Sequence, residues 1–316
     1  RIVAFSSEAE YQPFRINAFS PAYFAGGAGQ DTIVLGCVTK ENFPALRHEY
    51  VHHLIGARWR HLPLWLEEGL ADYYGGVDGS VAQARADRLR RGGLLPLSEL
   101  ALVVKSSAGY REREAALQFY AQSWALVHLL MTAPAYRAEA WVLVDRLNQG
   151  ESLESAVEWA YGRGAAQLQA DLAAHLGRLQ INDAASRPAV RVAVASMAGA
   201  DEVGLALARL LLRKGDLSGA QRYLDELADS SRGNPELWSL TGELALKRGR
   251  PLDAKFALRE ALRLGSRDAR GLRQLAVLEQ NAMNRAELAP VLARLVDVDP
   301  ADDEARRALT SLQAPR

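Results

Sequence analysis

The chain has 316 residues, 49% of them hydrophobic, and its 38 lysines and arginines balance 38 aspartates and glutamates, for a formal net charge of zero. This length and apolar content predict two domains with sizeable cores, whereas the balanced charge argues against a protein that binds nucleic acid. No run approaches the roughly 20 apolar residues that a membrane span requires, and a single cysteine, Cys37, rules out an intrachain disulfide.

Three apolar stretches near the start of the chain, 1–5, 15–19 and 32–38, have the composition of short β-strands. A glycine-rich piece, 26–31, separates the apolar residues 22–24 from the last of these stretches, which predicts a hairpin. The same piece matches a phosphate-binding loop poorly, because it lacks the G-K-S/T ending and a following helix. We therefore expect a small sheet before the first long helix.

The segment 43–55 is predicted to form a short helix. Asn42 is a candidate N-cap, Pro44 falls in the first turn, and Gly56 is a candidate C-terminal stop. Apolar residues at helical spacing supply faces that can be partly buried: Ala45, Leu46, Val51, Leu54 and Ile55.

Residues 48–52 of this helix are His-Glu-Tyr-Val-His, the H-E-x-x-H pattern. Two histidines four residues apart lie about 40° from each other around a helix, so His48 and His52 can bind one zinc ion. Glu49 then lies beside the metal without binding it, where a general base for a zinc-bound water is needed. A surface helix with incidental histidines would carry the same letters, so a third ligand nearby has to decide between the two interpretations.

The segment 64–74 is predicted to form a second helix, which Pro63 begins and Gly75-Gly76 ends. Glu68 and Asp72 are four residues apart and therefore share one of its faces. On that face Glu68 could ligate the metal, and Asp72 could accept the second ring proton of a ligand histidine. The alternative for Asp72 is an ordinary solvated acid, because periodicity alone does not aim a side chain.

The letters HEYVH followed by LPLWLEEGLADYY resemble the gluzincin metallopeptidases, in which a second helix donates a glutamate to the zinc. The wording W-L-x-E-G-x-A is most similar to the bacterial peptidase MA-like proteins, many of which carry tetratricopeptide repeats. The resemblance is strong over 44–76 and weaker to about 177. It implies Glu68 as the ligand in preference to Glu67, which spacing alone does not exclude. It also implies an α+β, thermolysin-like catalytic domain with a small N-terminal sheet, the H-E-x-x-H helix and a helical lobe.

Two features depart from the related membrane-alanyl-type aminopeptidases. The stretch between His52 and Glu68 is shorter than in those enzymes, so the loop that joins the two helices is shorter as well. No G-A-M-E-N-like segment, which anchors a free amino terminus in that group, lies upstream. The resemblance therefore does not imply exopeptidase activity, and an endopeptidase is the favoured expectation.

The donor to the developing oxyanion is predicted to come from the strongly helical segment 117–130. Its Y-A-Q-S-W-A-L-V wording resembles the corresponding helix of peptidase MA-like proteins, which implies a catalytic role for Tyr120. The alternative is that Tyr120 belongs to an apolar core stripe, since aromatics at helical spacing usually do. Tyr110 and His128 are the next candidates for the same role.

Other polar residues are assigned structural roles. His53 points about 100° away from His52 around the helix and cannot share its metal. His61 and His175 have no partner in the sequence, and lone histidines are usually satisfied by local hydrogen bonds. The arginine cluster 85–91 alternates with apolar residues, as one face of a solvated helix does.

The last third of the chain carries a repeat. The pattern of 214–216, with an alanine at 220, recurs at 248–250 with an alanine at 254, and a degenerate third unit follows at 284–286. This resembles tetratricopeptide repeats, in which stacked helix pairs form a surface that binds peptide or protein segments. We expect about three pairs and a terminal capping helix over 301–312; a plain helical bundle is the alternative.

The predicted organisation is a gluzincin-like metallopeptidase domain over 1–180, a linker over 181–200, and helical repeats over 201–316. The chain begins at Arg1 without an initiator methionine, which predicts a removed leader and export to the periplasm or beyond, with a cytoplasmic location left open. The predicted function is hydrolysis of a peptide or protein substrate with one Zn²⁺ ion, and the repeats are predicted to bind a protein partner. Two alternatives are an interaction module with an inactive or autoinhibited peptidase-like domain, and a zinc hydrolase of non-peptide amides.

Overall fold

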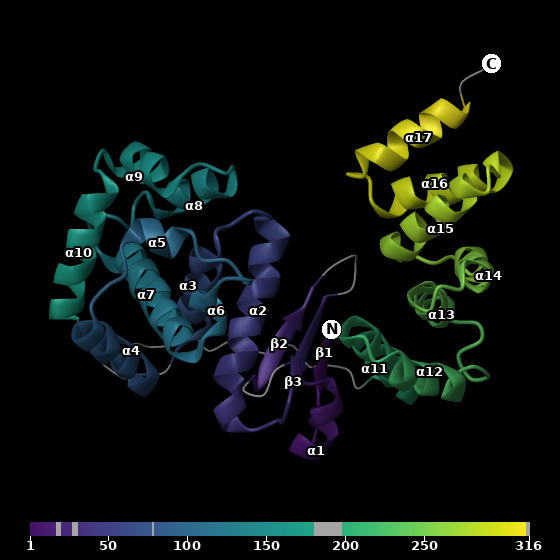
Figure 1. Ribbon diagram of the computed structural model, residues 1–316, viewed down its shortest axis with the longest axis horizontal. Coiled ribbons are helices and arrows are strands. Elements are labelled where there is room, and N and C mark those ends of the chain that lie inside the picture. The colour runs from purple at the N-terminus through teal and green to yellow at the C-terminus, as the bar shows by residue number, and fades with distance from the viewer. Residues whose placement is uncertain (17–19, 27–30, 78, 180–197, 314–316) are drawn as a thin grey trace. The chain divides into compact units, whose positions relative to one another are not determined.

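A computed structural model describes residues 1–16, 20–26, 31–77, 79–179 and 198–313 (Figure 1). Most of these residues are helical, and the described strands form one small sheet. Contacts divide the chain into two compact units, which we call the motif unit (21–24 and 33–191) and the helix-pair unit (1–20, 25–32 and 192–316). Among the described helices, none has the length and apolar character needed to cross a membrane.

The sheet consists of β1 (Ile2–Ala4), β2 (Ala22–Ala25) and β3 (Thr32–Leu35) in the order β1-β3-β2, so β2 is an edge strand. The N–H of Gly36 donates to the carbonyl of Pro21 at 2.8 Å, which closes the antiparallel pair of β2 and β3. The strand predicted over 15–19 is wrong at its described residues, 15 and 16. The chain forms α1 (Glu8–Tyr11) and the 3₁₀ turn η1 (Gln12–Phe14) before them, and residues 17–19 lie outside the described residues.

The first two helices described in the motif unit are α2 (Phe43–Arg58), which follows the 3₁₀ turn η2 (Lys40–Asn42), and α3 (Leu64–Gly75). The stop predicted at Gly56 is wrong. The helix continues to Arg58, and the N–H of Trp59 still donates to the carbonyl of Ile55 at 2.7 Å. α3 ends as predicted, because Gly76 adopts the left-handed conformation (φ +76°) that glycine tolerates best.

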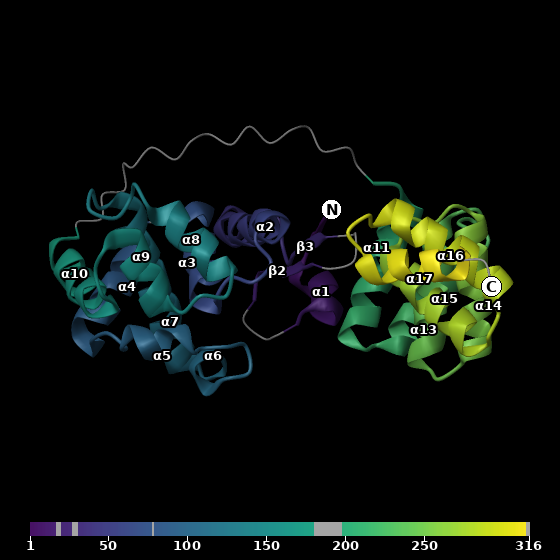
Figure 2. The ribbon, with the colours of Figure 1, turned by 90° about the horizontal axis from the view of Figure 1, so that it is seen from above.

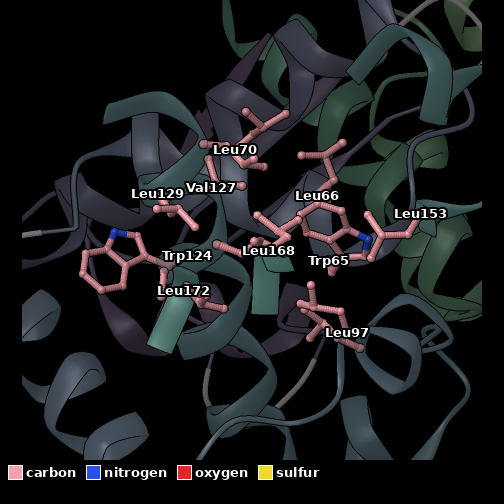
Figure 3. Close-up of a cluster of buried hydrophobic side chains, with 14 of the residues drawn as sticks. Trp65, Leu66, Leu70, Leu97, Trp124, Val127, Leu129, Leu153, Leu168 and Leu172 are labelled. Atoms are coloured by element: carbon pink, nitrogen blue, oxygen red, sulfur yellow. The ribbon is translucent and has the colours of Figure 1, made fainter. Parts of the chain in front are cut away.

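The remaining helices of the motif unit surround α7, which contacts α3, α4, α6 and α10 (Figure 1, Figure 2). Their bounds are α4 Gly79–Gly92, α5 Leu97–Ala101, α6 Ala108–Arg111, α7 Arg113–Thr132, α8 Ala140–Asn148, α9 Leu153–Tyr161 and α10 Ala165–Arg178. Side chains from these helices interlock with Trp65, Leu66 and Leu70 of α3 to form one apolar core (Figure 3).

The core leaves no room for a side chain at Gly69. A Cβ added there would lie 2.5 Å from the backbone oxygen of Ser123 and 2.6 Å from a methyl of Val127. α3 and α7 therefore touch at backbone distance, and this fixes the face of α3 on which Glu68 lies.

The helix-pair unit contains three successive helix pairs and a terminal helix, in agreement with the number expected from the repeat. Their bounds are α11 Ala200–Lys214, α12 Leu217–Glu226, α13 Pro235–Lys247, α14 Pro251–Arg263, α15 Ala269–Asn281, α16 Arg285–Val298 and α17 Asp303–Gln313. The predicted linker, 181–200, lies outside the described residues except for 198–200.

One backbone feature explains the spacing of the repeat. Gly215 and Gly249 both adopt positive φ, +87° and +69°, at the turn within a pair. The equivalent position of the third pair is Met283, which is held at φ +54° and is 89% exposed. The third unit is thus degenerate in sequence while it keeps the same turn.

The N-terminal segment packs on the first helix pair of its unit. Lys214 Nζ donates to the carbonyl of Pro13 at 2.6 Å, and the rings of Phe14 and Tyr223 lie 6.4 Å apart. Residues 1–20 and 25–32 therefore belong to the helix-pair unit by their contacts. Sequence periodicity carries no signal for such long-range packing.

Candidate metal centre

Three potential ligands from α2 and α3 converge in the motif unit. His48 Nε2 and His52 Nε2 lie 3.1 Å apart, and Glu68 Oε2 lies 3.3 Å from the first and 3.4 Å from the second. His48, His52 and Glu68 are the group in the described part of the chain whose donor atoms come close enough together to hold a metal ion. The helical period brings the two histidines together, and the packing of α3 on α2 brings Glu68 to them.

The spacing of the three atoms fits a tetrahedral ion. Zinc bonds of 2.0–2.1 Å place neighbouring ligand atoms about 3.3–3.4 Å apart, close to the three distances found here. Glu68 is only 4% exposed, and its Oε2 accepts no well-aligned hydrogen bond from the described residues. A buried carboxylate oxygen without a donor is costly, so a cation is the natural partner for it.

Asp72 supports one of the ligand histidines. His48 Nδ1 donates to Asp72 Oδ1 at 2.9 Å, and this leaves His48 Nε2 directed at Glu68 and His52. The other carboxylate oxygen of Asp72 accepts from Arg85 Nη1 on α4. The structure thus brings His48, His52, Glu68 and Asp72 together, and it adds Arg85, which was assigned to a solvated face.

Glu49 lies beside this cluster and is not one of the converging ligands. Burial raises the pKa of its carboxyl group, while His48, His52 and a hydrogen bond from the Phe24 backbone N–H act in the opposite direction. Phe24 belongs to β2, so the edge strand lies against the H-E-x-x-H helix. A carboxyl group with a raised pKa is a better proton acceptor near neutral pH than an exposed glutamate.

The metal ligands strongly affect each other's ionisation in the metal-free protein. Burial alone would lower the pKa of His48, but interactions with Asp72 and Glu68 prevail and raise it to about 10. Burial would raise the pKa of Glu68, but His48 and His52 hold it well below its usual value. A proton on His48 therefore compensates the negative charge of Asp72 and Glu68.

Two tyrosines form a hydrogen-bonded chain that ends on the third ligand. Tyr120 donates its hydroxyl to that of Tyr110 at 3.0 Å, and Tyr110 donates to Glu68 Oε1 at 3.1 Å. Burial and the charge of Glu68 raise the pKa of Tyr110 to about 12 and shift the pKa of Tyr120 upward as well. Both phenols therefore keep their protons at neutral pH, and Tyr110 is the one in contact with the cluster.

The remaining histidines lie elsewhere. His53 faces the ring of Phe24 at 5.9 Å, and the backbone N–H of His61 donates to Asn148 at 3.0 Å. His128 and His175, which were treated separately, have ring nitrogens 2.9 Å apart. His128 contacts this partner and the Tyr73 ring, which does not favour it as the oxyanion donor.

The sequence does contain a signal for Arg85. Ala82, Ala86 and Leu89 are buried at helical spacing on α4, and Arg85 falls among them on the inward side. The prediction treated all arginines of 85–91 as one solvated face and therefore missed that Arg85 lies near the buried residues of α4.

No model of a known protein family matches the chain, and no curated protein matches it either. The converging ligand atoms of His48, His52 and Glu68 are therefore the most specific functional observation for this chain.

Proposed function

We propose that the protein is a zinc-dependent endopeptidase of the gluzincin type, similar to the peptidase MA-like proteins. The observation that carries this proposal is the convergence of His48 Nε2, His52 Nε2 and Glu68 Oε2 within 3.4 Å of one another. Two imidazoles and one carboxylate form the donor set of catalytic zinc sites, which keep a further position open. When bound, zinc supplies a Lewis acid that acidifies water and polarises a carbonyl group.

Glu49 is the general base in this proposal. Its carboxylate accepts the proton of the attacking water and transfers it to the leaving amine nitrogen. Glu49 follows His48 directly in α2 and is not one of the three residues whose ligand atoms converge. Burial keeps its pKa raised, and this favours proton transfer near neutral pH.

The oxyanion donor is Tyr110, with Tyr120 as the residue that positions it. The Tyr110 hydroxyl is in direct contact with Glu68, whereas Tyr120 reaches the cluster only through Tyr110. A phenol that keeps its proton can donate a hydrogen bond to negative charge as it develops on the substrate carbonyl. From the sequence alone, Tyr120 ranked ahead of Tyr110 for this role, and the present assignment reverses that order.

The substrate is an extended peptide that adds to β2 as a further strand. β2 lies at the edge of the described sheet, the position at which extended peptides join a sheet through main-chain hydrogen bonds. Phe24 on this strand already reaches Glu49 with its backbone N–H, so a chain bound there would pass the general base. Recognition of this kind uses main-chain groups and does not require a free amino terminus.

Replacing Glu49 by Gln tests the proposal. We expect Glu49→Gln to retain about one equivalent of zinc and to cleave peptides about 10²–10⁴-fold more slowly, because only the base is lost. Glu67→Gln is the matched control, since it removes the neighbouring carboxylate and should change neither property. Metal analysis, together with mass spectrometry of fragments from a denatured protein mixture, measures both.

Four outcomes decide against the proposal or narrow it. Undiminished cleavage by Glu49→Gln contradicts the role of Glu49, and wild-type protein that binds no zinc contradicts the metal site. Products made only of single terminal residues indicate an exopeptidase. Zinc binding without any cleavage, combined with a protein partner captured by the repeats, favours an interaction module with an inactive or autoinhibited peptidase-like domain.

A further inference from the structure

Arg85 reaches the metal cluster from a third helix. Its Nη1 donates to Asp72 Oδ2, while Asp72 Oδ1 accepts from His48 Nδ1 at 2.9 Å. The Asp72 side chain is 7% exposed and that of Arg85 is 20% exposed, so the contact is largely shielded from solvent. Each oxygen of the Asp72 carboxylate thus has its own donor, and the chain Arg85–Asp72–His48 ends at a ligand nitrogen.

Arg85 differs from the other arginines of α4. Arg88, one turn later, pairs at 3.0 Å with Glu114, whose side chain is 78% exposed, and Arg90 donates to the backbone carbonyls at the end of α10. Neither contact involves a residue of the ligand cluster. Arg88 therefore provides a matched control for Arg85: the same residue type, on the same helix, without a link to the ligands.

We propose that Arg85 is a positioning residue for the metal site, acting through Asp72 on His48. This rests on the proposed function, because the metal is the group that His48 is oriented to bind. A guanidinium on Oδ2 prevents the buried carboxylate from rotating, so that Oδ1 stays in line with His48 Nδ1. His48 then keeps its proton on Nδ1 and presents Nε2 as the ligand atom.

The chemistry favours arginine at this position over lysine. The guanidinium is planar, permanently charged and weakly hydrated, so it can be held at a largely buried carboxylate without losing its charge. It also compensates the negative charge of Asp72 in a site that already contains Glu49 and Glu68. Without Arg85, Asp72 Oδ2 would be a buried carboxylate oxygen without a donor, which is costly and favours rearrangement of the side chain.

A double-mutant cycle read out by zinc affinity tests the proposal. We expect Arg85→Met to weaken zinc binding about tenfold, and Asp72→Asn to weaken it about 10–100-fold, as losses of outer ligand partners do. If Arg85 acts through Asp72, the double variant binds zinc no more weakly than Asp72→Asn alone. Competition with a chromogenic chelator measures these dissociation constants, and Arg88→Met should leave the constant unchanged.

Further variants separate positioning from general stability. Arg85→Lys keeps the charge and one donor and should recover most of the affinity, and thermal unfolding of each metal-free variant reports its fold. Equal zinc affinity for wild type and Arg85→Met, or additive losses in the double variant, overturns the proposal while leaving the peptidase assignment standing. A wild-type protein that binds no zinc overturns both. If Arg85→Met does not fold, Arg85→Gln, which also removes the charge, replaces it in the cycle and is judged by the same criterion.

Discussion

Both units of this protein bury carboxylates, but they compensate the charge in different ways. In the helix-pair unit Glu279 is fully buried, and its two oxygens lie 2.9 Å from Lys255 Nζ and 2.6 Å from Arg259 Nε. In the motif unit Glu68 is nearly as buried, yet its Oε2 faces two imidazole nitrogens at 3.3 and 3.4 Å. Glu279 thus has the permanent cations lysine and arginine as neighbours, whereas Glu68 has two histidines.

This difference separates a structural ion pair from a candidate metal site. A buried carboxylate that faces arginine and lysine has permanent cations within the chain. A carboxylate that faces two histidines becomes complete only with a proton or a metal ion. Burial alone would not distinguish Glu68 from Glu279; the chemistry of their neighbours does. Substitutions in the two units can test this contrast.

The largest effect is expected at Glu68. Glu68→Gln removes a metal ligand, so the zinc-dependent part of the stability disappears with it. At a free zinc concentration 1,000 times the dissociation constant, zinc should stabilise the wild type by about 4 kcal/mol, and the variant by almost nothing. Thermal unfolding with and without zinc measures this, with Glu67→Gln as the control. Equal stabilisation of wild type and Glu68→Gln would exclude Glu68 as a ligand.

A smaller loss, without any dependence on metal, is expected at Glu279. Glu279→Gln leaves Lys255 and Arg259 without their carboxylate, and because the Arg259 side chain is 39% exposed the loss should lie below that of a fully buried pair, about 3–5 kcal/mol. Denaturant unfolding measures the loss, while zinc affinity should not change. Asp253→Asn is the control, because its partner Arg250 and Asp253 itself are exposed, and such a pair contributes about 0–1 kcal/mol. A neutral Glu279→Gln would mean that the pair is not buried in solution.

The third prediction concerns a buried histidine without a carboxylate. Burial, and then the neighbouring His175, lower the pKa of His128 from 6.5 to about 4. The fold therefore favours the neutral ring, and its contribution is complete above about pH 6.5 and lost as the pH falls toward 4. The shift corresponds to at most about 3 kcal/mol.

Replacing His128 isolates this contribution. The unfolding free energy of His128→Gln should fall less steeply than that of the wild type between pH 6.5 and 4, and denaturant titrations across this range measure the difference. His175 and Tyr73 contact the His128 ring, and the pKa of His175 is lowered as well. The contribution of His128 is therefore the difference between the pH profiles of the wild type and of His128→Gln. Parallel profiles would contradict the prediction.

The smallest effect is expected at Met283, which adopts a left-handed conformation. The equivalent positions of the first two helix pairs are the glycines Gly215 and Gly249. Met283→Gly should stabilise the protein by about 1 kcal/mol, because the strain of a side chain at positive φ is removed. Met283 is exposed, so little packing is lost with it. Met283→Ala, which keeps the Cβ, should not stabilise and is the matched control in thermal unfolding.

The sequence predicted those parts of the site that lie within single helices. His48 and His52 meet because of the helical period, and Glu68 and Asp72 share a face of α3 for the same reason. Contacts between helices were predicted poorly. Tyr110 was ranked behind Tyr120, Arg85 was assigned to solvent, and His128 was separated from His175. Each of these depends on how α4, α6, α7 and α10 pack, which local periodicity does not encode.

The same reasoning applies to the fold. The helix pairs were predicted because their repeat is local, whereas the packing of the N-terminal segment on the first pair was missed because Pro13 and Lys214 are far apart in the chain. Gly56 was interpreted as a stop, but it lies in open space within α2, where a glycine lowers helix stability without ending the helix.

Gly75 has no side chain that could bind a metal, yet it constrains the spacing of α2 and α3 and with it the positions of the candidate ligands. A Cβ at this position would lie 2.8 Å from the Cα of His48, so α2 and α3 touch there through their backbones. Any larger residue would have to displace the helices by about 1 Å, which a core tolerates but a ligand set spaced at 3.1–3.4 Å does not. In evolutionary terms, we expect a substitution of Gly75 to disturb the candidate metal site before the fold, so that an intact H-E-x-x-H sequence would not by itself mark a metal-binding chain.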